Sequence, residues 1–405
     1  MSNARGQSER WARHGRVRGE MRWLRVGAAG AVALTSEVVA GQATRQEALQ
    51  RGWSAHGTIE AYHEWNAGGP GNGINNHRAF DKASGSLVVQ NASFGVETGM
   101  DRLRARIFFQ TGSLPPVQAY ALGPTPPIDA ESPEARHVRE VNVAYEARVG
   151  EGVWVEAGLF EWPVGLEDAW VHRSWCWSRS NLYLAMPSRF AGARVTYPSH
   201  GDWAAMAGVF NGWTGLEENN GEKTLSAGVK RSWGEEVAAG LRYVGGVERD
   251  VGAREGRAWR HLLDGQVEGE LASGLRLGFE GNGGMEPGRM GTTWWMGAEL
   301  MLRVEVSSVV HVTGRLDGIR QVARKRSGEV ASPVLFIGPG GGSGTLTIEA
   351  RMPSGVSWVL EGRRDQGASP QFFRGEVLGS GAKDNPYEPN SMGQTTVLVG
   401  TTAWF

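Results

Sequence analysis

The chain lacks features on which most soluble and helical membrane proteins depend. Its 405 residues include one cysteine, Cys176, and no apolar run of the ~18 or more residues that a membrane-spanning helix needs. A single thiol excludes an internal disulfide framework and a zinc site built from several thiolates. Neither sign of charge is in excess, because 42 Lys and Arg oppose 43 Asp and Glu. The net charge of −1 removes the electrostatic basis for binding nucleic acid.

Glycine and tryptophan, by contrast, are abundant. The 60 glycines make up about 15% of the chain, against a usual ~7%. Because glycine weakens helices and strands, this excess indicates many turns and close backbone contacts. The 17 tryptophans outnumber the 7 tyrosines. Indole rings are favoured at membrane interfaces, where one edge of the ring is apolar and the other is hydrated.

The first 40 residues are interpreted as a targeting segment. Residues 21–40 have a basic start, a modest apolar stretch and a small-residue end at Ala40, the outline of a secretory signal peptide. Met21 is a candidate for the true start, which the sequence leaves open, and the mature chain is expected to begin near Gly41. The alternative for residues 1–40 is a disordered basic arm with no targeting role.

From Trp53 onward, segments of about ten residues alternate in polarity as β-strands do. Residues 345–352 (TLTIEARM) alternate throughout, and residues 102–110 do so except at Phe108. Ten residues at ~3.3 Å each span about 33 Å. A strand tilt of ~45° reduces this length to roughly the 25 Å apolar band of a membrane β-barrel.

The spacing of these segments predicts the architecture. The expected strands are residues 53–66, 86–98, 102–112, 138–148, 152–162, 189–197, 202–213, 222–231, 235–248, 259–271, 275–285, 292–304, 308–320, 343–352, 356–365 and 394–405. The gaps between them alternate strictly, with short ones such as 99–101 followed by long ones such as 113–137, 163–188 and 366–393. Short periplasmic turns and long outer loops are typical of bacterial barrels. The sequence thus predicts an all-β fold, a transmembrane antiparallel β-barrel of about 16 strands over residues 41–405, with roughly twelve to eighteen strands open.

Several motifs resemble a known family. A terminal strand that ends on the aromatic Phe405 resembles the closing strand of bacterial outer-membrane barrels. Residues 57–66 followed by Arg78-x-Phe80-Asp81, residues 158–168 and residues 209–213 together resemble the OmpL-like β-barrel porin family. The resemblance implies a passive channel in the outer membrane of a Gram-negative bacterium. It also implies insertion by the barrel assembly machinery, which recognises the C-terminal strand.

The polar positions of the strands are expected to line a water-filled lumen. Candidate wall residues are Arg104, Arg106, Glu140, Glu146, Arg148, Glu268, Glu280, Glu299, Arg303, Arg315 and Asp317. Selectivity depends on charge at the narrowest point, so the preference for anions or cations stays open. Segment 163–188 is the candidate for a loop folded into the pore, and the alternative is an external loop. Its candidate constriction residues are Glu167, Asp168, His172, Arg173 and Arg179.

No enzyme, cofactor or metal site is expected. The glycine-rich residues 338–344 lack the following Lys-Ser or Lys-Thr of a phosphate-binding loop and are interpreted as a flexible outer loop. His311, near Thr313, is interpreted as a wall residue.

The sequence therefore predicts a porin through which small hydrophilic solutes or ions diffuse passively. The alternative is a plugged structural or adhesive barrel whose outer loops bind a partner. A homotrimer surrounded by outer-membrane lipid is left open, because porins are often trimers.

Overall fold

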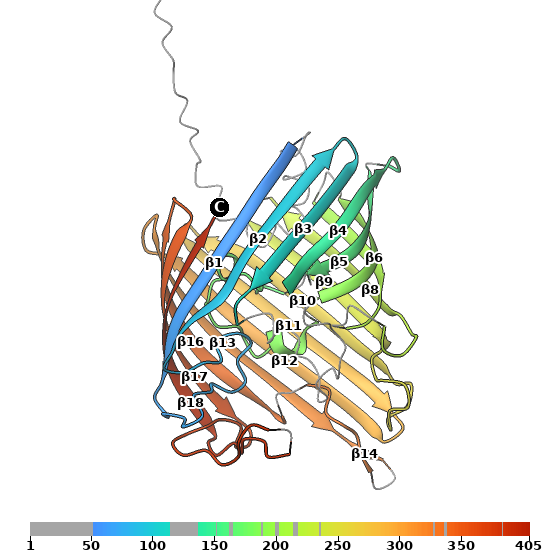
Figure 1. Ribbon diagram of the computed structural model, residues 1–405. Helices are drawn as coiled ribbons and strands as arrows, with labels where there is room; N and C mark the ends of the chain where they lie inside the picture. Colours follow the sequence, from blue (N-terminus) through green and yellow to red (C-terminus); the bar gives the residue numbers. More distant parts are fainter. Residues whose placement is uncertain are drawn as a thin grey trace, which may run out of the picture.

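The computed structural model of the chain is a closed antiparallel barrel of sixteen strands (Figure 1). It describes residues 52–113, 137–150, 152–161, 165–187, 189–198, 202–213, 218–234, 236–326, 329–335, 338–382 and 384–405. The barrel strands are β1 (Gly52–Asn66), β2 (Leu87–Met100), β3 (Leu103–Thr111), β4 (Val138–Ala147), β5 (Val153–Glu161), β6 (Arg189–Pro198), β7 (Trp203–Phe210), β8 (Thr224–Trp233), β9 (Val237–Val247), β10 (Trp259–Ala272), β11 (Leu275–Gly288), β12 (Gly291–Glu305), β13 (Val310–Ala323), β16 (Gly340–Met352), β17 (Val356–Gly367) and β18 (Gly393–Trp404). A small separate hairpin joins β14 (Lys325–Arg326) to β15 (Glu329–Val330).

The first and last strands close the barrel. β1 pairs with β18 from Thr58↔Trp404 to Asn66↔Thr396. The backbone N–H of Phe405 donates to Gly57 O at 3.1 Å, and Gly57 N–H donates to Phe405 O at 3.2 Å. In lipid, an unpaired sheet edge would leave a row of unsatisfied peptide groups, and closure removes it. The predicted barrel of about 16 strands, closed by the terminal strand, is confirmed.

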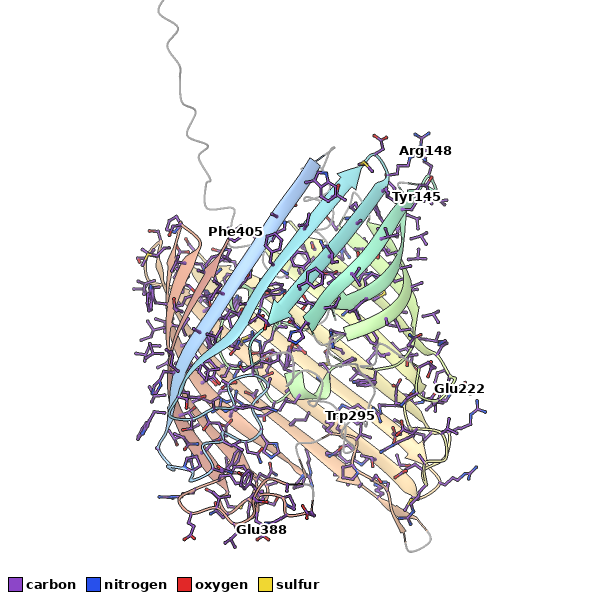
Figure 2. All side chains as sticks on the ribbon, in the orientation of Figure 1. Tyr145, Arg148, Glu222, Trp295, Glu388 and Phe405 are labelled. Carbon is purple, nitrogen blue, oxygen red and sulfur yellow. The ribbon has the colours of Figure 1, made fainter. Side chains whose placement is uncertain are left out.

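The two faces of each strand differ in polarity. On β18, Val397 and Val399 are 42% and 53% exposed on the outer wall, whereas Leu398 and Thr402 face inward and are buried. This follows from the two-residue period of a strand. The same alternation runs round the barrel, so that large apolar side chains cover the outside and most charged side chains lie inside (Figure 2).

The connections differ in length at the two ends of the barrel. The C-terminus lies at the end with the tight turns, and the long loops lie at the other end (Figure 1). The sequence predicted that short and long connections would alternate strictly along the chain. This is wrong at the connection between β11 and β12, which belongs to the long-loop end but consists only of Arg289 and Met290. Described residues of the β9–β10 and β13–β16 connections meet beside this short hairpin. Arg249 Nη2 donates to Ser332 O at 3.4 Å, and the Ser332 hydroxyl bonds to Glu255.

The glycine-rich residues 340–344 correct another expectation. They form the start of β16 and pair with both β13 and β17, instead of forming a flexible outer loop. A Cβ on Gly340 would lie 2.2 Å from Ile319 O, and one on Gly341 would lie 2.7 Å from Gln366 O. Glycine is therefore required here by close approach of neighbouring strands.

The expected signal peptide, the alternative start at Met21 and the boundary at Gly41 lie outside the described residues. In the part of the chain that is described, no helix has the length and apolar character needed to cross a membrane.

The seam between β1, β18 and β17 provides a test of closure. Val399 lies opposite His63 on one side and Leu360 on the other. The substitution Val399→Pro removes a backbone donor from the middle of a central strand, which sheets do not tolerate. We expect the variant to lose the folded, heat-modifiable band on an unheated gel after refolding in detergent. Val399→Thr, the matched control, keeps the donor and should fold as the wild type does. Equal folded fractions for the proline variant would contradict the assigned register.

Candidate functional site: a loop folded into the barrel

The residues 165–187, which connect β5 to β6 and are called here the lumen loop, lie inside the barrel. They include two short 3-10 helices, Val171–Arg173 and Tyr183–Ala185. The Trp177 ring packs in an interior cluster with Tyr62, Val359 and Leu398, which come from β1, β17 and β18. The segment thus occupies the place expected from the sequence, and its role as a constriction stays a prediction.

Wall carboxylates hold the lumen loop by its backbone. Glu361 on β17 accepts the N–H groups of both Trp177 (2.7 Å) and Ser178 (3.0 Å). Hydrogen bonds to a charged acceptor contribute about 1.5–3 kcal/mol each. Further bonds of this kind run from Leu166 N to Glu280 (2.6 Å), from Val171 N to Glu60 (2.8 Å) and from Asn181 N to Asp317 (3.0 Å). The loop is therefore fixed to β1, β11, β13 and β17.

Three of the wall carboxylates form a row across neighbouring strands. Glu280 on β11 is in register with Glu299 on β12, which is in register with Asp317 on β13. Like charges directly opposite one another destabilise a sheet. The loop amides at two of these positions and the guanidinium of Arg315, whose Nε lies 3.4 Å from Asp317 Oδ1, offset that repulsion.

Wall arginines complete the attachment by donating to the loop. Arg315 is buried and pairs with Glu167 of the loop at 2.5 Å, while also donating to Ser178 O at 2.6 Å. Arg351 donates to His172 O at 2.8 Å, and Arg363 donates to Arg179 O. The loop's acceptors and donors are thus both met by the wall, as buried polar groups require.

Arg179, a candidate constriction residue, folds the loop from within. Its guanidinium is buried and donates to the carbonyls of Asp168 (2.6 Å), Ala169 (3.3 Å), Cys176 (3.2 Å) and Trp177. Glu167 is likewise occupied by Arg315. Neither charge is presented to water, although the sequence had suggested that both could face a channel.

The other three candidate constriction residues, Asp168, His172 and Arg173, have side chains that are partly exposed to solvent. Asp168 and Arg173 pair at 3.6 Å, with 20% and 25% of their side chains exposed. The His172 ring stacks on Trp404, with centroids 5.1 Å apart and an interplanar angle of 12°. Of the five candidate constriction residues, these three are the ones whose side chains are partly exposed.

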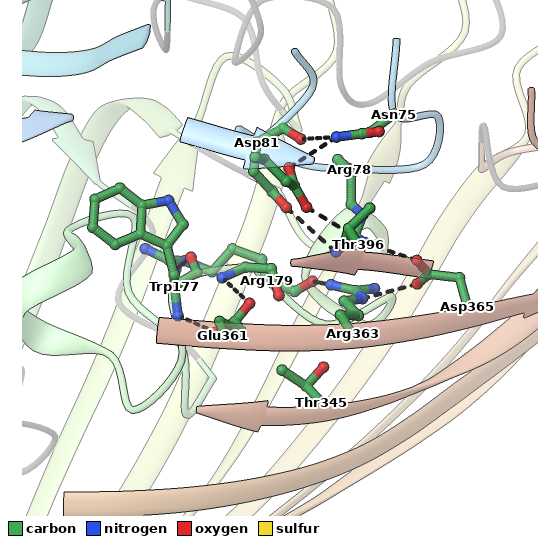
Figure 3. A network of polar contacts seen from close by, with 12 residues as sticks. Asn75, Arg78, Asp81, Trp177, Arg179, Thr345, Glu361, Arg363, Asp365 and Thr396 are labelled. Atoms are coloured by element: carbon green, nitrogen blue, oxygen red, sulfur yellow. Dashed lines mark hydrogen bonds and ion pairs between the residues drawn. The ribbon is translucent and has the colours of Figure 1, made fainter. Parts of the chain in front are cut away.

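A second buried network, around Arg78, was not assigned to the site from the sequence. Arg78 Nη2 lies 2.9 Å from Asp365 Oδ2 and donates to Thr396 Oγ1 at 2.8 Å, and its Nη1 lies 3.3 Å from Asp81 (Figure 3). Asp365 in turn pairs with Arg363 at 2.8 Å, which reaches the lumen loop. The Arg78-x-Phe80-Asp81 motif was the signal that could have found this link.

The candidate wall residues are placed as follows. Buried on the lumen side are Glu140, Glu268, Glu280, Glu299, Arg303, Arg315 and Asp317. Half-buried on that side are Arg104, Arg106 and Glu146. Arg148 was wrongly assigned to the wall, because β4 ends at Ala147 and Arg148 is exposed at the turn end (Figure 2). It continues the polar alternation of the strand without continuing the strand itself.

Two further positions bear on the chemistry. Phe108, which interrupts the polar alternation, faces inward and packs edge-on against Trp170 of the lumen loop at 6.1 Å. His311 lies opposite Glu305 and Glu349 near the turn end of β13, and the nearby Thr313 hydroxyl accepts from Arg303 at 3.5 Å. Over the residues described above, no group of three or more His, Cys, Asp or Glu side chains is arranged to hold a metal ion.

Residues 52–405 match the family described as "Putative beta-barrel porin-2, OmpL-like". The chain belongs to this family. The match covers the entire barrel from β1 to the terminal Phe405, so the resemblance seen in the sequence motifs is confirmed. A search of curated proteins found no match.

Solved structures share the porin fold at low sequence identity. An anion-selective porin from Comamonas acidovorans superimposes with a TM-score of 0.56 at 12% identity, covering 88% of this chain and 100% of that chain. The outer-membrane channel DcaP of Acinetobacter baumannii gives 0.54 at 7% identity, covering 88% and 98%. A loop-deletion mutant of OmpT from Vibrio cholerae gives 0.55 at 8%, covering 87% and 99%.

Cys176 reports whether the lumen loop is docked. Burial raises the pKa of its thiol to about 12, so the reactive thiolate is scarce in the folded protein up to at least pH 9. We expect alkylation of Cys176 to be slow from pH 7 to 9 when folded, and fast once the chain is denatured. Rates can be measured by mass spectrometry after timed quenching.

Gly400 is the position from which the loop can be displaced. A Cβ there would lie 2.5 Å from the Trp177 ring, so Gly400→Val should push Trp177 off the wall and speed alkylation of Cys176. Gly265→Val is the control, since a Cβ at Gly265 meets only ordinary contacts at 3.6 Å or more. Unchanged alkylation in Gly400→Val would contradict the docked position of the loop.

Proposed function

We propose that the protein is an outer-membrane porin of a Gram-negative bacterium whose diffusion path is narrowed by the lumen loop. Small hydrophilic solutes or ions would pass down their gradients without any chemical step, so the protein is a channel and not an enzyme. Membership of a porin family and the closed sixteen-strand barrel support this proposal. The observation that carries the narrowing is the attachment of loop amides to wall carboxylates on four strands.

The free path is proposed to run between the lumen loop and strands β7 to β9. The hydrogen bonds and ion pairs of the loop go to β1, β2, β5, β11, β13, β16 and β17. Its residues 184–186 share a buried cluster with Phe210 of β7 and Val244 of β9 toward the long-loop end, so the proposed path passes the turn-side part of these strands. On the turn-side part of β7 to β9 the lumen-facing positions include Ala204, Ala238 and Gly240, whereas Phe210 and Arg242 lie over Gly208 and Gly228. Small side chains leave room for a solute that large ones would fill.

A weak preference for anions is proposed, because several wall carboxylates are covered by backbone amides of the lumen loop. Glu60, Glu280, Asp317 and Glu361 are covered by loop amides and thereby withdrawn from the path. Lys230 and Arg242 face the lumen on β8 and β9, along the proposed path, and Arg242 lies in register with Asp264 of β10. Charge at the narrow part of a channel, rather than total charge, decides which ions pass.

Membrane partners are proposed on the same basis. The outer wall would contact lipid, and the C-terminal strand ending at Phe405 would be recognised by the barrel assembly machinery. A homotrimer is also proposed. One neighbour of the same fold, OmpT of Vibrio cholerae, is described as a trimer form, with a TM-score of 0.53 at 10% identity and coverage of 88% of this chain and 100% of that chain.

Conductance across a planar lipid bilayer tests the channel and its constriction. The chain from Gly41 to Phe405 should give discrete, long-lived steps. Arg315→Met breaks a buried ion pair, a change that costs about 3–5 kcal/mol, and should free the loop. We expect larger and noisier steps. Arg231→Met, the control, alters an arginine beside Trp203 and Trp233 at the turn end of the outer wall and should leave conductance unchanged. A wild-type barrel that folds but shows no conductance would contradict the proposed channel function.

Reversal potentials in a salt gradient test the selectivity. The double substitution Lys230→Gln with Arg242→Gln removes two basic groups from the proposed path. We expect the reversal potential to move toward that of a cation-preferring channel. Arg231→Gln, one residue from Lys230 but on the opposite face, should not move it. Equal reversal potentials in all three proteins would place the path elsewhere.

A further inference from the structure

A groove of about 580 Å³ lies on the outer wall of the barrel. It crosses β12, β13, β16, β17 and β18 and is lined mainly by outward-facing residues, among them Leu302, Leu316, Leu346 and Val397. The lining is therefore almost entirely hydrocarbon. It occupies the surface that a membrane protein presents to lipid.

Glycines form the floor of the groove. Gly314 faces Leu302 and Leu346 across the ladder, and Gly362 faces Leu346 and Val397. A Cβ at either glycine would meet nothing within 4 Å, and neither residue has a positive φ. Glycine in a strand interior weakens the strand. Since neither packing nor backbone conformation requires these two glycines, the effect of the missing side chains is the groove itself.

A basic group stands at one end of this groove. Arg364 is exposed on the outer wall of β17, three residues before the strand ends at Gly367 on the long-loop side. Its guanidinium donates to Thr395 Oγ1 at 2.9 Å and to Gln366 Oε1 at 3.5 Å. Within the described ranges, no carboxylate pairs with it. Arg320, on β13, is a second exposed arginine near the same end.

The outer wall itself supplies no anion for Arg364. Acidic residues of the described barrel strands face the lumen or lie at strand ends, as Glu270 and Glu305 do. The strands of a second copy packed wall to wall would therefore bring hydrocarbon and no mid-strand carboxylate to this guanidinium. Lipid headgroups at the same level of the membrane carry phosphate, to which arginine donates charge-assisted hydrogen bonds.

We propose that the groove binds a lipid of the outer leaflet, with an acyl chain lying over Gly314 and Gly362 and a phosphate on Arg364. The apolar floor matches the chain, and the guanidinium at the long-loop end matches the headgroup. Arginine facing lipid is costly near the midplane and nearly neutral at the interface, so a position near the end of β17 suits a group bound to phosphate.

Native mass spectrometry of the full chain in detergent tests the site, with lipid A as the phosphorylated probe and phosphatidylethanolamine as the zwitterionic comparison. Wild-type protein should retain lipid A in preference. Arg364→Gln should reduce its occupancy about tenfold, the loss expected for one charge-assisted contact. Gly362→Leu, which fills the floor without a clash, should cause a similar loss.

Matched controls separate a site from general adhesion. Arg231→Gln alters an outer-wall arginine at the turn end, and Gly265→Leu alters a glycine on β10, away from the groove. Both should retain lipid A as the wild type does. Equal retention by Arg364→Gln and wild type, or equal loss in the controls, would overturn the proposal. It would also fail if Gly362→Leu dissociated an oligomer while leaving lipid binding intact, because the groove would then be a contact between copies.

Discussion

The arrangement of the barrel interior depends on a row of buried carboxylates whose mutual repulsion must be offset by hydrogen-bond donors and positive charge. Glu280, Glu299 and Asp317 stand side by side on three neighbouring strands, where their negative charges repel one another. Water could screen such a row in an open pore. Here, however, these side chains are buried, and the lumen loop supplies amide donors while Arg315 supplies positive charge. The wall and the loop are therefore joined in one network of hydrogen bonds and ion pairs.

The same network extends to the connection between β1 and β2. Arg78 joins that connection to Asp365, and Asp365 holds Arg363 against the lumen loop. Two loops that enter the barrel from the same end are thus coupled through one strand, β17. In the proposed channel, the width of the path would be set by side chains whose positions are fixed by buried ion pairs.

The sequence predicted the strands well, for a local reason. Alternation in polarity is a property of neighbouring residues, so the sixteen strands could be placed without knowing what they contact. The contacts within the lumen could not be placed in this way. Glu361 and Trp177 are 184 residues apart, and Arg315 and Glu167 are 148 apart. No spacing rule links such pairs. Arg179 was taken for a pore charge because its type was visible, whereas the carbonyls that surround it were not.

Two of the wrong predictions came from reading residue type without the neighbouring strands. Arg148 continued a polar alternation beyond the end of its strand, and the glycines at 340–344 had the composition of a loop. In each case residue type indicated one structure while the hydrogen-bonding partners across the sheet determined another. The Arg78 motif is a different case. Its residues were identified in the sequence, but their pairing with Asp365 on β17 was not.

The two-residue hairpin between β11 and β12 has a consequence for engineering. Because it is so short, the loops on its two sides meet beside it, through Arg249, Glu255 and Ser332. A foreign peptide inserted at Arg289 and Met290 would wedge these loops apart. The loop 368–392 is different, because bonds such as Asn390 Nδ2 to Arg374 O at 2.8 Å hold it together from within and its tip around Glu388 is exposed (Figure 2). It is the better place on this barrel to display an epitope at a cell surface.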